Sequence, residues 1–153
     1  MKKITSFTVN HDTLDKGMYI SRIDGDVVTY DIRMKKPNGG DYLSNSEAHT
    51  IEHLFATFAR NSRFSEAVLY VGPMGCRTGF YMLLRDTVSY KDAILLVRES
   101  MAFVRDFEGE LPGNKREECG NYLDHDLSGA KRVASDMANV LKNWTEEQLQ
   151  YAD

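Results

Sequence analysis

The chain has 153 residues, of which 19 are Lys or Arg and 23 are Asp or Glu, which gives a formal net charge of −4. Because domains usually have about 100 to 200 residues, and because 42% of the residues are hydrophobic, we expect one folded domain over residues 1–153 and no disorder. The acidic balance argues against a nucleic-acid-binding domain, which is usually basic. The longest aliphatic run, residues 93–97, is far shorter than the roughly 20 residues of a membrane helix. We therefore expect neither a nucleic-acid nor a membrane partner.

The first ten residues begin with two lysines, but they lack the apolar stretch of a secretory signal. Thr5, Ser6 and two further polar residues interrupt the stretch in which such a signal would be apolar. We therefore expect a cytoplasmic protein. In that reducing compartment the two cysteines, Cys76 and Cys119, are expected to remain thiols.

Three segments show the features of β-strands. Apolar and polar residues alternate along the first, which places Asp31 and Arg33 together on the polar face of a half-buried strand. The other two are rich in β-branched and aromatic residues and are separated by a tight segment, residues 73–76, that places Cys76 in or beside a turn. The strands are expected over residues 28–34, 66–72 and 78–85.

Helices are expected between and after these strands. Ser44 and Glu47 have the spacing of a capping box, and apolar residues then recur at helical spacing to about Arg60. Two further amphipathic segments follow, with a short last helix from about Thr145. The expected long helices span about residues 44–60, 89–107 and 128–143. Irregular connections argue against repeated βαβ units, so we predict an α+β fold with a mainly antiparallel sheet packed by helices.

The first helix contains His49-Thr50-Ile51-Glu52-His53, an H-x-x-E-H motif. Residues four apart lie on one face of a helix, so both imidazoles can hold one metal ion with Glu52 beside them. The helical wheel places both histidines away from the apolar stripe, so a distant loop or another subunit must enclose them. A catalytic metal usually has three protein ligands. The candidates for the third ligand are a downstream carboxylate, His125 or a thiolate.

This motif alone leaves other interpretations open. It is also the signature of inverzincin peptidases, in which the glutamate activates water, so a small zinc metallopeptidase is the alternative enzyme class. A purely structural metal site is the non-catalytic alternative. Two surface histidines can also fall four residues apart by chance.

Five blocks, taken together and in order, resemble the S-ribosylhomocysteine lyases, the LuxS family of autoinducer-2 synthesis. They span nearly the whole chain, and the chain length suits that single-domain family. The blocks are Ser6-Phe7-Thr8-Val9-Asn10-His11, Asp31-Ile32-Arg33, His49-Thr50-Ile51-Glu52-His53-Leu54, Gly72-Pro73-Met74-Gly75-Cys76-Arg77-Thr78-Gly79-Phe80-Tyr81, and the run from Glu118-Cys119-Gly120-Asn121 to Lys131.

The resemblance implies a homodimeric α+β metalloenzyme with active sites at the subunit interface. It would cleave the thioether of S-ribosylhomocysteine by carbonyl migration and β-elimination. The products would be homocysteine, recycled in the activated methyl cycle, and 4,5-dihydroxy-2,3-pentanedione, the autoinducer-2 precursor of quorum sensing. The family's metal ligands correspond to His49, His53 and Cys119, and each subunit would bind one divalent ion, with Fe(II) expected and Zn(II) also suited to these donors.

The resemblance also implies roles for residues outside the metal set. It assigns proton transfer to Cys76 and Glu52. Its substrate-binding positions correspond to Ser6, His11 and Arg33, with the first two acting on the neighbouring subunit's site. His125 is not counted as a ligand. Tyr70 stands where some family members have Asp, which puts the substrate contacts at that position in doubt.

Overall fold

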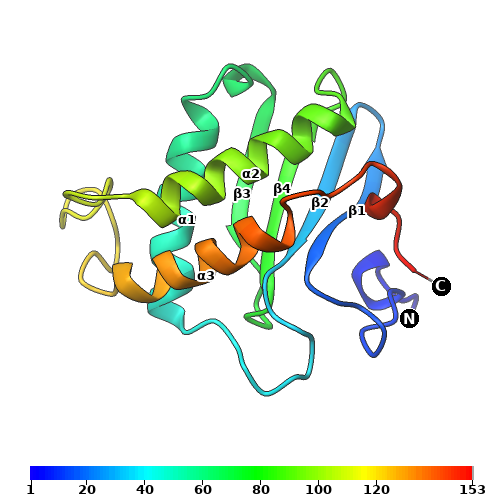
Figure 1. Cartoon of the computed structure of the whole chain (residues 1–153), viewed down its shortest axis with the longest axis horizontal. Helices are drawn as coiled ribbons and strands as arrows, with labels where there is room; N and C mark the ends of the chain where they lie inside the picture. The colour runs from blue at the N-terminus through cyan, green and yellow to red at the C-terminus, as the bar shows by residue number, and fades with distance from the viewer. Residues whose placement is uncertain (153) are drawn as a thin grey trace.

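Four strands form one antiparallel sheet in the computed structural model, which describes residues 1–152 (Figure 1). The strand order is β1-β2-β4-β3, and every neighbouring pair is antiparallel. The strands are β1 (Gly17–Asp24), β2 (Val27–Arg33), β3 (Val68–Pro73) and β4 (Gly79–Arg85).

Three α-helices pack against this sheet, which confirms the predicted α+β class. Helices α2 and α3 lie side by side, and α1 contacts both of them and edge strand β3 (Figure 1). Short 3-10 helices occur near each end and before β3. The α-helices are α1 (Asn45–Arg60), α2 (Tyr90–Asp106) and α3 (Leu127–Val140), and the 3-10 helices are η1 (Thr5–Phe7), η2 (Ser65–Ala67) and η3 (Glu147–Leu149).

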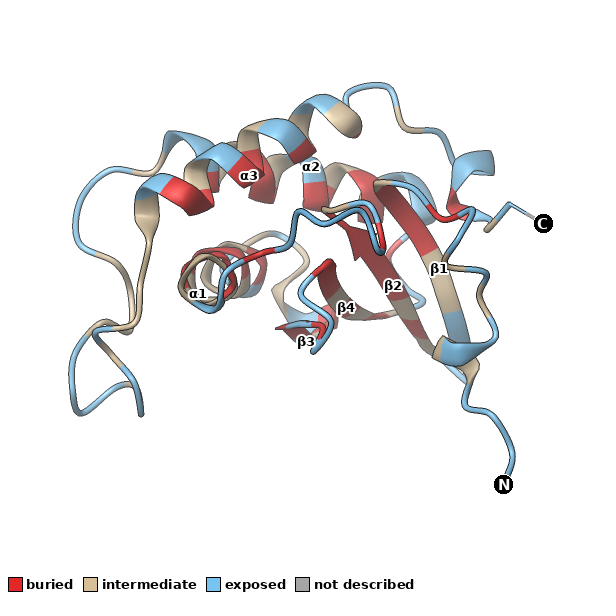
Figure 2. Cartoon of the chain, turned by 90° about the horizontal axis from the view of Figure 1, so that it is seen from below, coloured by how far each residue is buried: buried red, intermediate tan, exposed pale blue. Residues whose placement is uncertain are grey.

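The core lies between the helices and the facing side of the sheet, where Figure 2 shows the buried residues gathered. The central pair of strands contributes alternate residues, because side chains two apart in a strand point to the same face. Tyr30 opposes Met82 and Ile32 opposes Phe80, and all four are fully buried. Among residues 1–152, no helix is both long and apolar enough to cross a membrane.

The opposite face of the sheet is less exposed at Asp31 and Arg33 than predicted. Asp31 and Arg33 were expected on the polar face of a half-buried strand, but they are only 1% and 3% exposed. The C-terminal segment covers them, because Tyr151 contacts Asp31 directly. The prediction that only one face of this strand is buried was therefore wrong at this end. The contact with Asp31 comes from Tyr151, which lies 120 residues away in the sequence.

Strand β1 is absent from the prediction. Its first three residues, Gly17, Met18 and Tyr19, are all buried, so the strand lacks the alternation by which the others were found. Trp144 packs over Gly17, where an added Cβ would come within 2.3 Å of the indole. The other elements begin and end within three residues of their predicted bounds, and β3 begins after a 3-10 turn. The predicted last helix is the 3-10 helix η3.

Candidate metal centre and active site

Helix α1 carries the two histidines of the H-x-x-E-H motif. Its start is fixed by the predicted capping box, in which the Ser44 side chain accepts from the Glu47 backbone and the Glu47 carboxylate accepts from the Ser44 backbone. His49 and His53 follow on one face, with ring centroids 4.5 Å apart. The helix therefore presents the two imidazoles as a pair, as the spacing predicted.

The segment between α2 and α3, residues 107–126, encloses this pair. The His49 Nδ1 lies 2.8 Å from the Asp124 carbonyl oxygen, and the His53 Nδ1 lies 2.8 Å from the Pro112 carbonyl oxygen. A ring nitrogen that donates to a carbonyl leaves the other nitrogen as the metal-binding lone pair. The enclosing element is thus a distant loop of the same chain, one of the two possibilities that the helical wheel left open.

His125 completes a group of three imidazoles. Its ring stacks on His49 with centroids 4.2 Å apart, and its Nδ1 lies 2.9 Å from the Thr50 hydroxyl. One ring nitrogen from each of His49, His53 and His125 lies within 4.8 Å of the other two, so the three are positioned to bind a metal ion. His125 was one of the three candidates for the third ligand, but it was not counted as a ligand once the family resemblance pointed to Cys119. The fold brings it onto α1 through its contact with Thr50.

The environment of His125 suits a metal ligand. Burial, followed by the neighbouring charges of His49 and His53, lowers its pKa, which favours the neutral imidazole that binds metals. Its Nε2 is buried and has no hydrogen-bond partner among the described residues. A buried polar nitrogen without a partner is costly, and a metal ion would satisfy it. The residues present therefore fit a divalent ion.

Cys119, the expected thiolate ligand, lies at the edge of this group. Its Sγ is 3.4 Å from the His49 Nε2, and the Asn121 backbone N–H points to the same sulfur at 3.5 Å. In the described chain Cys119 is not one of the three residues with mutually close donor atoms. The fold thus brings the expected ligands together, with Cys119 beside His49 and with His125 as an additional donor. Glu52 lies half-buried on the same helix.

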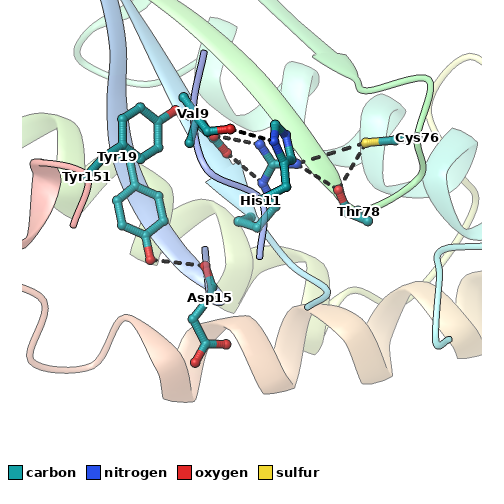
Figure 3. A network of polar contacts seen from close by, with 9 residues as sticks. Val9, His11, Asp15, Tyr19, Cys76, Thr78 and Tyr151 are labelled. Carbon is teal, nitrogen blue, oxygen red and sulfur yellow. Dashed lines mark hydrogen bonds and ion pairs between the residues drawn. The ribbon is translucent and has the colours of Figure 1, made fainter. Parts of the chain in front are cut away.

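A second polar cluster surrounds Cys76 (Figure 3). This exposed thiol lies 3.0 Å from the Thr78 hydroxyl and 3.9 Å from the Arg33 Nη1. His11 lines the same hollow of about 420 Å³, and its Nδ1 bonds to the Val9 carbonyl oxygen at 2.9 Å. None of the metal-cluster histidines lines this hollow.

Arg33 is held in place by a buried ion pair. Its Nε and Nη2 donate to the two carboxylate oxygens of Asp31 at 3.1 and 2.6 Å, and its Nη1 donates to the Thr78 hydroxyl at 2.8 Å. The Nε and Nη2 edge of the guanidinium, which is the edge that can bind a carboxylate with two nitrogens, therefore faces Asp31. The nitrogen left near the open hollow is Nη1, the one closest to Cys76.

Ser6 occupies a different hollow from His11 and Cys76. It lies in η1 and lines a space of about 470 Å³ on the outer side of the sheet, together with Tyr70 and Tyr81. Tyr70 is 48% exposed there. Ser6 and His11 thus line two different hollows of this chain.

Comparison with known proteins identifies the same family as the five sequence blocks. The family model described as S-Ribosylhomocysteinase (LuxS) matches residues 4–148. The chain belongs to the S-ribosylhomocysteinase family. It is 48% identical to the S-ribosylhomocysteine lyase of Clostridium acetobutylicum and 47% identical to that of Porphyromonas gingivalis strain ATCC 33277, each over the full length of both chains. The enzyme of that name from Clostridium beijerinckii is also 47% identical, over 99% of each chain.

These relatives confirm the family predicted from the sequence blocks. They give no support to the peptidase alternative, since all three are named as lyases. The family match includes both the histidine cluster and the Cys76 cluster. It ends before Tyr151, the residue that contacts Asp31.

Proposed function

We propose that this chain is a metal-dependent carbon–sulfur lyase that cleaves S-ribosylhomocysteine to homocysteine and 4,5-dihydroxy-2,3-pentanedione. The observation that carries the proposal is the family match over residues 4–148, which includes both polar clusters. The three full-length relatives named as S-ribosylhomocysteine lyases support the same substrate. We also propose that residues 1–153 form a single domain of this type.

His49, His53 and Cys119 are the proposed ligands of one divalent ion per subunit, with Fe(II) as the native ion and Zn(II) as a substitute. Imidazole suits both ions, and a thiolate adds a softer donor. When bound, such an ion supplies Lewis-acid stabilisation of negative charge on the sugar oxygens. The carbonyl contacts of the two imidazole Nδ1 atoms, both at 2.8 Å, support the proposal because they orient the rings as metal ligands.

Cys76 and Glu52 are the proposed proton carriers. An ordinary thiol with a pKa near 8.5 is only about 3% thiolate at pH 7, so a cysteine that acts as a base needs a neighbouring positive charge. The Arg33 Nη1, 3.9 Å from the sulfur, provides that charge, and the Thr78 hydroxyl at 3.0 Å can donate to the thiolate. Glu52 stands on α1 among the proposed ligands, where a carboxylate can exchange protons with bound substrate.

The reaction consists of proton transfers followed by one bond cleavage. A base removes a proton from the hydroxyl-bearing carbon beside a carbonyl, and the carbonyl oxygen gains a proton, which gives an enediol. The hydroxyl of the first carbon then loses its proton and the former carbonyl carbon gains one, so the carbonyl moves by one position along the sugar. When the carbonyl is suitably placed, removal of one more proton expels the thioether sulfur with the carbon–sulfur electron pair. Protonation of that sulfur gives homocysteine. No net oxidation or reduction occurs, so no redox cofactor is needed.

Ser6, His11 and Arg33 are proposed to bind the substrate in a homodimer with sites at the subunit interface. The separation of the Cys76 hollow from the histidine cluster supports this arrangement, because a second copy can bring the two together. Exposed apolar side chains beside the Ser6 hollow support it further, since Ile4 is 57% exposed and Phe7 is 68% exposed. The proposed location is the cytoplasm, where the products enter homocysteine recycling and autoinducer-2 signalling.

Product analysis tests the lyase proposal. Anaerobically purified, metal-loaded protein is incubated with S-ribosylhomocysteine, and both products are quantified, the thiol with a dye and the five-carbon dicarbonyl by mass spectrometry after trapping with a diamine. Equal amounts of the two products are expected. Folded, metal-loaded protein that releases neither would refute the lyase assignment, and cleavage of a peptide panel would then support the peptidase alternative.

A further inference from the structure

The C-terminal segment returns to the sheet and contacts the cluster around Cys76. Figure 3 shows Tyr151 from this segment in the same polar network as Cys76 and Thr78. The Tyr151 hydroxyl donates to the Asp31 Oδ2 at 2.7 Å. This contact joins the end of the chain to strand β2, across 120 residues of sequence.

The Arg33 side chain links Asp31 to the Cys76 thiol. The Asp31 Oδ2 that accepts from Tyr151 also accepts from the Arg33 Nη2 at 2.6 Å. Asp31 thereby fixes the Nε and Nη2 edge of the guanidinium and leaves the Nη1 directed at Thr78 and Cys76, at 2.8 and 3.9 Å. The carboxylate and the guanidinium are both almost fully buried, so their charges are weakly screened.

Tyr151 is itself held in a fixed position. Its ring stacks on Tyr19 with centroids 5.1 Å apart and an interplanar angle of 20°. Tyr19 in turn meets Trp144 edge-on, and its hydroxyl donates to the Asp15 carbonyl oxygen at 3.0 Å. Burial, and then the charge of Asp31, raise the pKa of Tyr151, so its hydroxyl remains protonated and donates at neutral pH.

We propose that Tyr151 is a positioning residue for the Cys76 thiolate, acting through Asp31 and Arg33. The hydroxyl shares the negative charge of Asp31, so more of the guanidinium's positive charge acts on the sulfur. Without the hydroxyl, Asp31 carries its full charge toward Arg33 and the thiolate is less stable. The inference rests on the proposed function, in which Cys76 is a proton carrier.

Other groups that face Cys76 must be considered before its titration is assigned to this network. Besides Arg33, the titratable or charged groups that line its hollow are His11, Tyr42 and Arg77. Tyr81 also interacts with the charge of Cys76. Each remains in place when only the Tyr151 hydroxyl is removed. A change in Cys76 titration in such a variant therefore reports on the contact with Asp31.

The rate of Cys76 alkylation against pH tests the proposal without needing substrate. Iodoacetamide modification is followed by peptide mass spectrometry, which separates Cys76 from Cys119. Tyr151→Phe keeps the ring stack and removes only the hydroxyl, whereas the matched control Tyr19→Phe removes the hydroxyl of the stacked partner, which bonds to Asp15 and not to Asp31. A variant that ends at Gln150 provides a second removal of the same contact.

We expect Tyr151→Phe to raise the midpoint of Cys76 alkylation by about half a pH unit, which is about threefold slower alkylation below the midpoint. The variant that ends at Gln150 should shift it in the same direction, and Tyr19→Phe should match the wild type. If Tyr151 were only a structural anchor, its substitution would lower the stability of the protein without moving the midpoint of Cys76 alkylation. An unchanged midpoint in both Tyr151 variants would overturn the proposal. If the wild-type protein shows no lyase activity, the proposed function is refuted, but the alkylation result at Cys76 still stands by itself.

Discussion

Thr50 links helix α1 to the segment that carries His125, and its substitution by valine provides a quantitative test of the metal centre. Thr50 is fully buried, and its hydroxyl makes two contacts, one with the His125 Nδ1 and one with the Asp126 backbone N–H, both at 2.9 Å. Valine keeps the shape and removes both contacts. Each partially buried group left without a partner costs about 1 kcal/mol, so we expect Thr50→Val to lose about 2 kcal/mol of unfolding free energy.

The same substitution should weaken metal binding. Thr50 holds the segment in which the Asp124 carbonyl oxygen orients the proposed ligand His49. Loss of a contact that orients a ligand typically reduces metal affinity about 10- to 100-fold. Urea unfolding of metal-free protein measures the first effect, and competition with a chelator measures the second. Thr57→Val, further along the same helix, is the matched control and should change neither quantity much. If Thr50→Val stays within about 0.5 kcal/mol of the wild type and keeps its metal affinity, the described link is wrong.

Three further substitutions test separate parts of the site and its support. Cys76→Ala should reduce turnover at least ~100-fold while metal content stays unchanged; near-normal turnover would contradict its role in proton transfer. Cys119→Ala should release the metal, measured by elemental analysis, and full retention would refute its assignment as a ligand. Ser44→Ala removes the side chain that caps α1 and should lower the unfolding free energy by about 1 kcal/mol in urea titration, whereas no change would mean that the cap contributes nothing.

Local signals were sufficient for most of the fold. The Ser44 and Glu47 capping box placed the start of α1 correctly, because both groups act within one turn of helix. Strand β1 was not predicted, because its first three residues are all buried and its sequence lacks the alternation that marks a half-buried strand. Trp144 covers one of these residues, Gly17. That contact depends on tertiary packing, which no local pattern encodes.

The site shows the same division between local and tertiary information. His49 and His53 were predicted from helical spacing alone, whereas Cys119 and Cys76 were assigned through family resemblance. His125 could be named only as one of three candidates for the third ligand, because the contact that brings it to α1, its bond with Thr50, joins residues 75 apart in the sequence. The burial of Arg33 was missed for a similar reason, since it depends on Asp31 and Tyr151. Such contacts become visible only when the fold is known.

Metal-dependent release of thiol from S-ribosylhomocysteine tests the central claim most directly. Anaerobically purified protein is divided into untreated, metal-stripped and Fe(II)-reconstituted samples, and thiol is followed with a reactive dye. We expect the untreated sample to release thiol, the metal-stripped sample to lose this release, and the reconstituted sample to recover it in proportion to bound metal, up to one ion per subunit. Thiol release that persists at full rate after the metal is removed, or no release by folded and metal-loaded protein, would contradict the central claim.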